Sequence, residues 1–363
     1  MSLGPLQIMT MSNVASIPQT KSIFRATDPS DLPRVTELLT RVFGSSVNAP
    51  YVDPLLMKWK YWDPREDFEG PRSYVLERNN LLLAHAGLWP VTMRNGGGER
   101  VRGIHMMDWA AAPNAPGAGL ALVQKLSGMF DFIYGIGGSE ITQKVLPALG
   151  FIEHATTWRG ARPLRPLRQI LSHPDRNWKL PARLVRNVLW SLYPMVAPKS
   201  GWEVVATTPQ QSADLLTALS RGKDFLPRTQ AFFEYLLRCP NATFQLHMVH
   251  DPGGARGLFA LARVRRQVRL AGLWLRDPDH ESWKQAHILA QKSAAQIEEG
   301  CEFVALGTQG RSADAATSSG LHLCGGPAVY LLDKKRNLSR DVQFQLCDND
   351  SVFSDSGRVG YWT

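Results

Sequence analysis

Residues 104–126 read IHMMDWAAAPNAPGAGLALVQKL, and this junction decides the fold. The apolar run up to Ala112 predicts a strand, and the apolar spacing after Gly119 predicts an amphipathic helix. Glycines at Gly117 and Gly119 let the backbone approach a ligand closely, and the free N–H groups of a helix start favour an anion such as a pyrophosphate. An ordinary tight turn between strand and helix is the alternative interpretation.

The sequence after this junction adds a second motif. An apolar strand-like run, FDFIYGIG at 130–137, is followed by SEITQKVLPALGFIEHA at 139–155. The combination resembles the GNAT superfamily of acyl-CoA-dependent N-acyltransferases. The family's Gln/Arg-x-x-Gly-x-Gly/Ala motif aligns with Asn114–Gly119, with Asn in the first place. Its Leu-Gly-Phe turn, from a helix into a strand, aligns with residues 148–151.

The resemblance covers residues 22–158 and returns more weakly over 201–347. It implies an α/β (α+β mixed) fold of two tandem GNAT-like domains, each a mixed, mostly antiparallel sheet flanked by helices. Both halves repeat one order of elements, namely helix, helix, three strands, helix, strand, helix and strand, which favours a duplicated α/β domain. The three strands are predicted at 73–79, 81–94 and 101–112, and again at 244–251, 257–266 and 268–276.

The chain of 363 residues is long enough for two domains. We expect a flexible leader at 1–21, a GNAT-like domain with the CoA loop at 22–158, a basic proline-containing connector at 159–200, and a degenerate GNAT-like domain at 201–363. The leader lacks a positive start and a continuous apolar core, so it is not predicted to be a signal peptide. No stretch of eighteen apolar residues occurs, which excludes a membrane-spanning helix.

The resemblance also implies a place for the co-substrate, acetyl-CoA or another acyl-CoA, without a metal. The pantetheine arm would lie between strands 101–112 and 130–136, and the pyrophosphate on the loop. A backbone amide would face the thioester oxygen, where charge develops during acyl transfer. The expected cofactor-binding residues are Met107, Asp108, Asn114, Ala115, Pro116, Gly117, Ala118, Gly119 and Leu120.

Direct attack of an amine on a thioester needs a base, because the amine arrives protonated. Asp108 is the leading candidate, since burial among apolar neighbours would raise its pKa. His105 is the second, and strand alternation would place it on the opposite face from Asp108. Glu140, at a helix start, is the third. Each has a structural alternative: a loop cap or arginine partner for Asp108, a packed histidine for His105, and service to the helix dipole for Glu140.

Two departures from the family pattern bear on activity. A tyrosine that protonates the leaving thiolate is often found five residues before the Phe of the Gly-Phe turn, and here that position is Leu146. In the second half, the region corresponding to the CoA loop reads Asp-Pro-Asp-His-Glu at 277–281, without a glycine pair. Its acids would repel a pyrophosphate, so the second half is predicted to shape the acceptor cleft instead.

Most of the positive charge lies in one segment. The net charge is +9, and residues 159–199 carry nine Lys/Arg against the single acid Asp175, so the rest of the chain is nearly neutral. An ordered connector with a solvated basic edge is one interpretation. A contact with an anionic partner, such as a phosphate, RNA or lipid headgroups, is the other.

Three tryptophans and an aspartate-rich tail each have a functional and a structural interpretation. Trp59, Trp62 and Trp89 could line an acceptor pocket or pack in the core, and core packing is the preferred interpretation. Three aspartates in the tail at 347–357 are reminiscent of a calcium loop, but Phe353 stands where that loop needs glycine, so a solvated turn is expected.

The function predicted from these observations is acyl-CoA-dependent N-acyl transfer, most simply acetyl transfer to an amine of a small molecule or sugar. Two alternatives stay open: a tandem-GNAT transferase that takes its donor from aminoacyl-tRNA, and a non-catalytic CoA- or ligand-binding protein. Four well-separated cysteines and no CxxC motif fit a reducing cytoplasm. The sequence does not indicate an oligomeric state.

Overall fold

The fold is that of a computed structural model. Residues 1–20 of the expected leader lie outside the described residues, as do several in the connector. Within the described part, no helix is both long and apolar enough to cross a bilayer. The structure describes residues 21–46, 48–94, 99–172, 178, 180–192, 195–220, 228–276, 279–308, 310–335, 338, 342–354 and 361–363.

The two halves of the chain repeat one order of elements, as predicted. The first half consists of β1 (Ile23–Ala26), α1 (Leu32–Phe43), α2 (Pro54–Tyr61), β2 (Ser73–Arg78), β3 (Leu81–Arg94), β4 (Arg100–Ala111), α3 (Ala118–Leu126), β5 (Phe132–Ile136), α4 (Glu140–Val145) and β6 (Ile152–Pro163). The second consists of β7 (Glu203–Ala206), α7 (Pro209–Leu219), α8 (Gln230–Leu237), β8 (Thr243–Asp251), β9 (Gly254–Val264), β10 (Gln267–Leu275), α9 (His280–Gln296), β11 (Glu302–Thr308), α10 (Arg311–Ser318) and β12 (His322–Leu332).

Helices α5 (Pro166–Leu171) and α6 (Leu180–Leu192) connect the halves. Five short 3-10 turns complete the described part: η1 (Pro29–Asp31), η2 (Pro50–Val52), η3 (Pro147–Leu149), η4 (Leu346–Asp348) and η5 (Asp350–Val352).

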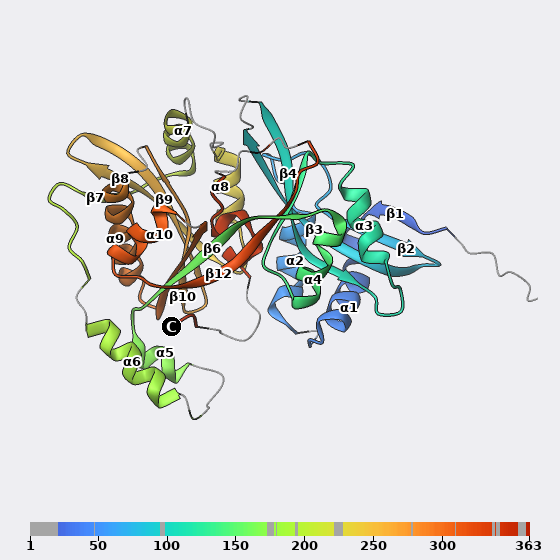
Figure 1. The fold of residues 1–363 in the computed structure, drawn as a ribbon, viewed down its shortest axis with the longest axis horizontal. Coiled ribbons are helices and arrows are strands. Elements are labelled where there is room, and N and C mark those ends of the chain that lie inside the picture. Colours follow the sequence, from blue (N-terminus) through green and yellow to red (C-terminus); the bar gives the residue numbers. More distant parts are fainter. Residues whose placement is uncertain are drawn as a thin grey trace, which may run out of the picture.

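All the strands form a single sheet in the order β1-β2-β3-β4-β5-β12-β6-β11-β10-β9-β8-β7. The last strands of the two halves are exchanged. β12 pairs with β5 of the first half, and β6 pairs with β11 of the second half. β6 and β12 also pair with each other across the middle of the molecule (Figure 1). The boundary expected after residue 158 therefore falls inside β6, a strand that belongs to the sheet of both halves.

Local sequence signals set the ends of the first helices. Asp28 and Asp31 form a reciprocal capping box around η1, which leads directly into α1. α1 ends at Gly44, whose φ of 61° is the left-handed conformation that closes a helix without a Cβ clash. Thr208 and Gln211 form the equivalent box at the start of α7. The halves thus begin alike because the same cap chemistry starts both.

The main apolar cluster joins the two halves. Trp59 of α2 stacks on Tyr235 of α8 with ring centroids 4.6 Å apart, and its indole N–H donates to the carbonyl of Tyr235 at 3.1 Å. Trp89 lies against both rings and donates to the carbonyl of Cys347. Trp59 and Trp89 are therefore core residues, and Trp62 is half-buried with its N–H on Thr27.

The first arginines of the basic connector donate hydrogen bonds to backbone carbonyls of the second half. Arg165 donates to the carbonyls of Ala295 (2.8 Å), Ile297 (2.9 Å) and Gly300, and Arg168 to that of Glu298, all at or just beyond the C-terminal end of α9. Cations are favoured there because the helix end carries partial negative charge and unpaired carbonyls. Arg159 and Arg162 likewise donate to carbonyls, those of Gly325 and Gly320.

Candidate active site

The site is built on a bulge in β4. Strand β4 pairs with β5 in parallel only over Gly103–His105, and beyond His105 the two strands separate while β4 continues to Ala111. Three residues after His105, Asp108 has a φ of 50°, and the register with β3 shifts by one residue at this point. Such a bulge re-aims the side chains around it.

The bulge breaks the alternation expected from the sequence. Asp108 reaches α2, where its Oδ2 accepts from Lys60 Nζ and from the Tyr61 hydroxyl, each at 2.5 Å. His105 reaches the 342–354 segment, where its Nε2 lies 3.5 Å from Oδ1 of Asp350. The negative charges of Asp108 and Asp350 both act on Tyr61. His105 and Asp108 thus belong to one cluster and do not face opposite sides of the sheet.

Lys60 and Asp108 form a buried ion pair, with side chains 3% and 9% exposed. Burial, together with the charge of Asp108, raises the pKa of Tyr61 well above its usual value, so Tyr61 keeps its proton and donates it to the carboxylate. With two donors on one oxygen, Asp108 is a charge partner that holds α2 on the bulge. Asp108 therefore fits the structural alternative, a carboxylate paired with a basic side chain, better than it fits a free general base.

His85 holds the backbone of the same bulge. Its Nδ1 lies 3.0 Å from the carbonyl of Asp108, and its Nε2 lies 2.9 Å from the hydroxyl of Ser73. A carbonyl only accepts, so Nδ1 carries the proton and Nε2 accepts from Ser73. Burial lowers the pKa of His85 to about 4, which keeps the ring neutral at physiological pH.

His105 is a buried histidine with a carboxylate beside one ring nitrogen. Its side chain is buried, and its Nδ1 has no hydrogen-bond partner among the described residues. Burial raises the pKa of Asp350, but the hydrogen bond and charge of His105 and the charge of Lys60 outweigh it and hold that pKa below its usual value. Asp350 is therefore held in its ionised form beside Nε2 of His105.

The 342–354 segment is fixed over the first half by buried contacts. Arg228 forms an ion pair with Asp348, whose other oxygen accepts from the amide of Gln345 at 2.7 Å. The hydroxyl of Tyr134 on β5 donates to the carbonyl of Asp348. These contacts bring Asp350 to His105, although the two residues are far apart in the sequence.

The glycine loop lies where β4 runs into α3. Gly117 is the N-cap of α3 with a φ of 80°, and no side chain caps this helix start. The amide of Ala118 donates to Ala115, and Ala121 is the first to bond back to Gly117. No backbone acceptor is found for the amides of Gly119 and Leu120 within the described chain, and a Cβ at Gly117 would have no atom within 4 Å.

The remaining expected residues are placed as follows. Met107 is buried on β4 next to the bulge, and Ala115 and Ala118 pack into the apolar cluster under α3. Asn114, Pro116 and Leu120 lie in the loop and first turn of α3. Glu140 is exposed on the first turn of α4, whose N-cap is Ser139, outside the buried cluster. Leu146 and Tyr134 are buried, and burial raises the pKa of Tyr134 far above its usual value.

The second half has a matching divergence, but the chain itself lies across it. β10 and β11 pair in parallel up to Leu270 and then separate. Beyond that point Gln345 bridges Gly307 of β11 and accepts from the amide of Leu273 of β10 at 2.5 Å. The start of α9 is also capped, since Asp279 accepts from the amide of Ser282 at 2.9 Å. Among the described residues, the uncapped helix start beside diverging parallel strands is found in the first half.

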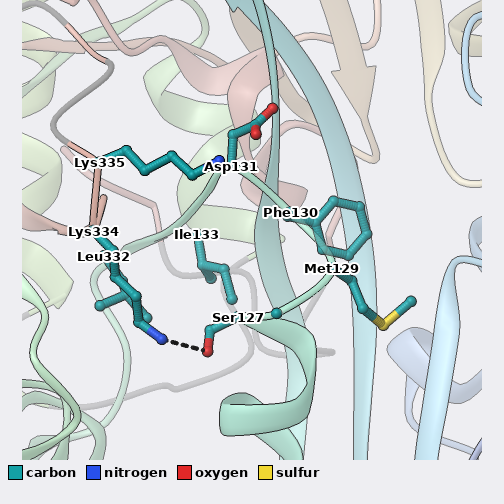
Figure 2. A pocket seen from close by; sticks show the side chains of 9 residues that line it. Ser127, Met129, Phe130, Asp131, Ile133, Leu332, Lys334 and Lys335 are labelled. Atoms are coloured by element: carbon teal, nitrogen blue, oxygen red, sulfur yellow. Dashed lines mark hydrogen bonds between the residues drawn. The ribbon is translucent and has the colours of Figure 1, made fainter.

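A pocket of about 180 Å³ opens at the opposite end of α3 and is separate from this site (Figure 2). Lys334 donates there to Ser127 at 3.1 Å, next to Lys335 and Asp131. The C-terminal end of a helix carries partial negative charge, which disfavours an anion beside it. The pocket therefore gives no second place for the CoA pyrophosphate.

Sequence reasoning missed three members of the cluster. Lys60 and Tyr61 lie in the aromatic-rich stretch 55–62, which also contains Lys58, and nothing local distinguishes the buried lysine from the exposed one. Asp350 lies in the tail for which the sequence predicts a solvated turn, and that prediction is wrong, because Asp348, Val352 and Phe353 are buried. Nothing local marks Asp350 as a partner of His105, because only the tertiary fold brings the two together. Within the described residues, no group of three metal-ligating side chains is found.

The doubled sheet, with parallel strands that diverge and a glycine loop at a helix start, has a fold similar to that of solved GCN5-related N-acetyltransferases and of an N-myristoyltransferase. A GCN5-related N-acetyltransferase from Anabaena variabilis is similar, with a TM-score of 0.56 and 11% identity over 86% of this chain and 73% of that one. A GCN5-related N-acetyltransferase from Kribbella flavida gives 0.51 and 11% over 87% and 72%.

An N-myristoyltransferase of Saccharomyces cerevisiae, solved with bound myristoyl-CoA and inhibitors, is also similar. Its TM-score is 0.55 with 12% identity, covering 94% of this chain and 88% of that one. At such identities the likeness shows the fold alone. No protein-family model matches the sequence, and no curated protein matches it.

Proposed function

We propose that this protein is an acyl-CoA-dependent N-acyltransferase, which transfers the acyl group, most simply acetyl, to an amine of a small molecule or sugar. The observation that carries the proposal is the position of His105. This buried histidine, with a carboxylate on one nitrogen and no partner on the other, lies where β4 and β5 separate. The glycine loop lies at the other end of the same stretch of β4.

The donor side fits an acyl-CoA of extended shape. The uncapped amides of α3 supply N–H groups and a helix dipole for the pyrophosphate, and the missing Cβ of Gly117 leaves space beside them. The stretch of β4 from Ala111 back to Met107 would bind the pantetheine arm by its backbone. The bound donor supplies an activated thioester, and the amide of Met107 or Asp108 would donate to its carbonyl oxygen.

On the acceptor side, His105 would remove a proton from the attacking amine through Nδ1. This nitrogen is covered by protein atoms in the structure, so ligand binding would have to uncover it. Asp350 would stabilise the resulting imidazolium and orient the ring. Asp108 would act as a positioning residue, because its ion pair with Lys60 holds α2 against the bulge. Neither Leu146 nor Tyr134 is placed to protonate the thiolate, so we propose that it leaves unaided or takes a proton from water.

The alternatives are less well supported. An aminoacyl-tRNA donor would need the basic connector as an RNA contact, but Arg159, Arg162, Arg165 and Arg168 are already bound to carbonyls of the protein. The cysteines Cys239, Cys301, Cys324 and Cys347 are all free, which supports a reducing compartment, and we propose the cytoplasm.

The test separates donor binding from catalysis. Thermal unfolding is followed with acyl-CoA of increasing chain length, and thiol release is then measured with a panel of amines. A donor at about a hundred times its Kd should stabilise the chain by about 2.7 kcal/mol. Gly117→Glu should abolish that shift. Gly44→Glu is the matched control, because Gly44 also has a positive φ and open space at its Cβ position but lies away from the loop.

His105→Gln and Asp350→Asn should leave donor binding intact. The first should lower kcat by about 10²–10⁴-fold, the usual contribution of a general base. If no acyl-CoA stabilises the wild type, the proposal is wrong at the donor. If donors bind but no amine releases thiol, the protein is a CoA-binding protein and not a transferase.

A further inference from the structure

The α5–α6 pair exposes several apolar side chains and buries two side-chain amides. Leu167 and Leu171 of α5 are 66% and 79% exposed, whereas Gln169 of the same helix is 1% exposed. In α6, Asn187 is fully buried. An ordinary surface helix has the opposite arrangement, with its apolar stripe against the core.

The buried amides are bound to each other and to the end of the chain. Asn187 donates to Gln169 at 3.0 Å, and Gln169 donates to the hydroxyl of Thr363 at 2.6 Å. On the same side of α6, Trp190 stacks on His322 of β12 with ring centroids 3.7 Å apart. These hydrogen bonds and the ring stack determine which face of α6 packs against the body, and the opposite face is therefore exposed.

The outward face of α6 carries Val185, Leu189 and Leu192, which are 60%, 54% and 71% exposed. Their spacing of four and three residues places them in one row along the helix. Trp178, just before α6, is also exposed. The pair stands at the edge of the molecule, beyond the end of the sheet (Figure 1). An exposed apolar row of this kind indicates a contact with something outside the chain.

The charge around this row indicates what that contact is. Between Glu153 and Glu203 the sequence contains one acid, Asp175, against nine Lys/Arg. Arg183 and Arg186 lie on α6 itself, and the guanidinium of Arg186 lies 4.6 Å from the ring of Trp190. Arg159, Arg162, Arg165 and Arg168 bind carbonyls of the protein, so the charge beside the apolar row comes from Arg183 and Arg186 of α6. A second copy of the same surface would be repelled by this charge.

We propose that the α5–α6 pair binds the surface of a membrane that contains anionic lipids. Leucine and valine side chains in one row, with arginines on the same helix, are the composition of a helix that lies in the lipid–water interface. α6 has 13 residues, too few to span a bilayer, so it would lie along the surface. Each basic residue near an anionic leaflet adds to the attraction.

The experiment is flotation of the full chain with vesicles of phosphatidylcholine alone or mixed with phosphatidylglycerol, without acyl-CoA. We expect binding to the mixed vesicles only, and weaker binding as salt is raised. Leu189→Asp combined with Leu192→Asp should weaken the apparent affinity by about tenfold or more. Leu81→Asp, at a leucine 65% exposed at the start of β3, is the matched control and should bind as the wild type does.

Unfolding temperatures of the variants confirm that they are folded, since all three leucines are exposed. The proposal is overturned if the wild type does not float with the mixed vesicles, or if the double variant floats as well as the wild type. It is also overturned if sedimentation shows a wild-type dimer that the double variant loses, because a second copy would then cover this face. Flotation needs no donor, so its outcome is independent of acyl transfer.

Discussion

The Lys60–Asp108 pair is the residue-scale feature that ties the site to the fold. Asp108→Ala leaves the buried ammonium of Lys60 without its counter-charge, and we expect a loss of about 3–5 kcal/mol in the free energy of unfolding. Lys60→Met together with Asp108→Ala should recover much of this loss, because no unpaired charge stays buried. Urea unfolding of both variants measures the difference.

A more exposed pair at the end of the same helix is the control. Lys58 of α2 and Asp63, just beyond the helix, are 61% and 32% exposed, so Asp63→Ala should cost less than about 1 kcal/mol. If Asp108→Ala costs no more than Asp63→Ala, the Lys60–Asp108 pair does not hold the bulge in the way described.

His287 predicts a pH dependence of stability. It is buried, both ring nitrogens lack a partner among the described residues, and burial lowers its pKa from 6.5 to about 3. The unfolded chain therefore binds the proton first as pH falls. Above about pH 6.5 the ring is neutral in both states and does not affect the pH dependence of stability. Between about pH 6.5 and pH 3 the free energy of unfolding falls by about 1.4 kcal/mol for each pH unit of acidification.

His287→Phe should remove this part of the pH dependence of the free energy of unfolding. Between pH 7 and pH 5 the variant should lose about 2 kcal/mol less stability than the wild type, as measured by urea unfolding at both values. His85, with a pKa of about 4, keeps its own contribution in the variant. Equal acid sensitivity of the two proteins would mean that His287 is hydrated or protonated in the folded state.

At the scale of elements, Arg165 explains why part of the connector is basic. It binds three carbonyls at the end of α9, so Arg165→Met should destabilise the chain by about 1.5–3 kcal/mol, the usual range for hydrogen bonds to a charged group. Arg168→Met, at an exposed residue with one carbonyl partner, should cost clearly less. Thermal unfolding of the two variants gives the comparison, and equal effects would contradict the capping role.

The elements also differ in how much of their structure can be predicted from the local sequence. The strands of β3 and β4 and the cap of α1 were predictable, because alternation and capping are local signals. The face of α6 was not. The apolar spacing of α6 predicts that its apolar face packs against the body. The buried hydrogen bonds of the Asn187 side-chain amide instead turn Val185 and Leu189 outward. The partners of Asn187 lie on other elements, so no window of α6 sequence contains that information.

For the whole molecule, the exchange of β6 and β12 makes the halves depend on each other. Each half takes its last strand from the other, and one apolar cluster joins both. We therefore expect a single cooperative unfolding transition. Fragments 1–200 and 201–363 produced separately should be unfolded or aggregated, and their co-expression should restore a folded complex. Two separate calorimetric transitions, or a stable isolated fragment, would show that the halves are independent.

The sequence by itself determined the duplicated order of elements, the strand–glycine–helix junction and the place of His105 and Asp108 on one strand. These are set by apolar periodicity and by glycines within a few residues of each other. Only the tertiary structure decided that Asp350 meets His105, that Lys60 meets Asp108, and that the halves exchange strands. Such contacts depend on packing between residues far apart in the chain, and on a backbone bulge that reverses the side-chain alternation a regular strand would have.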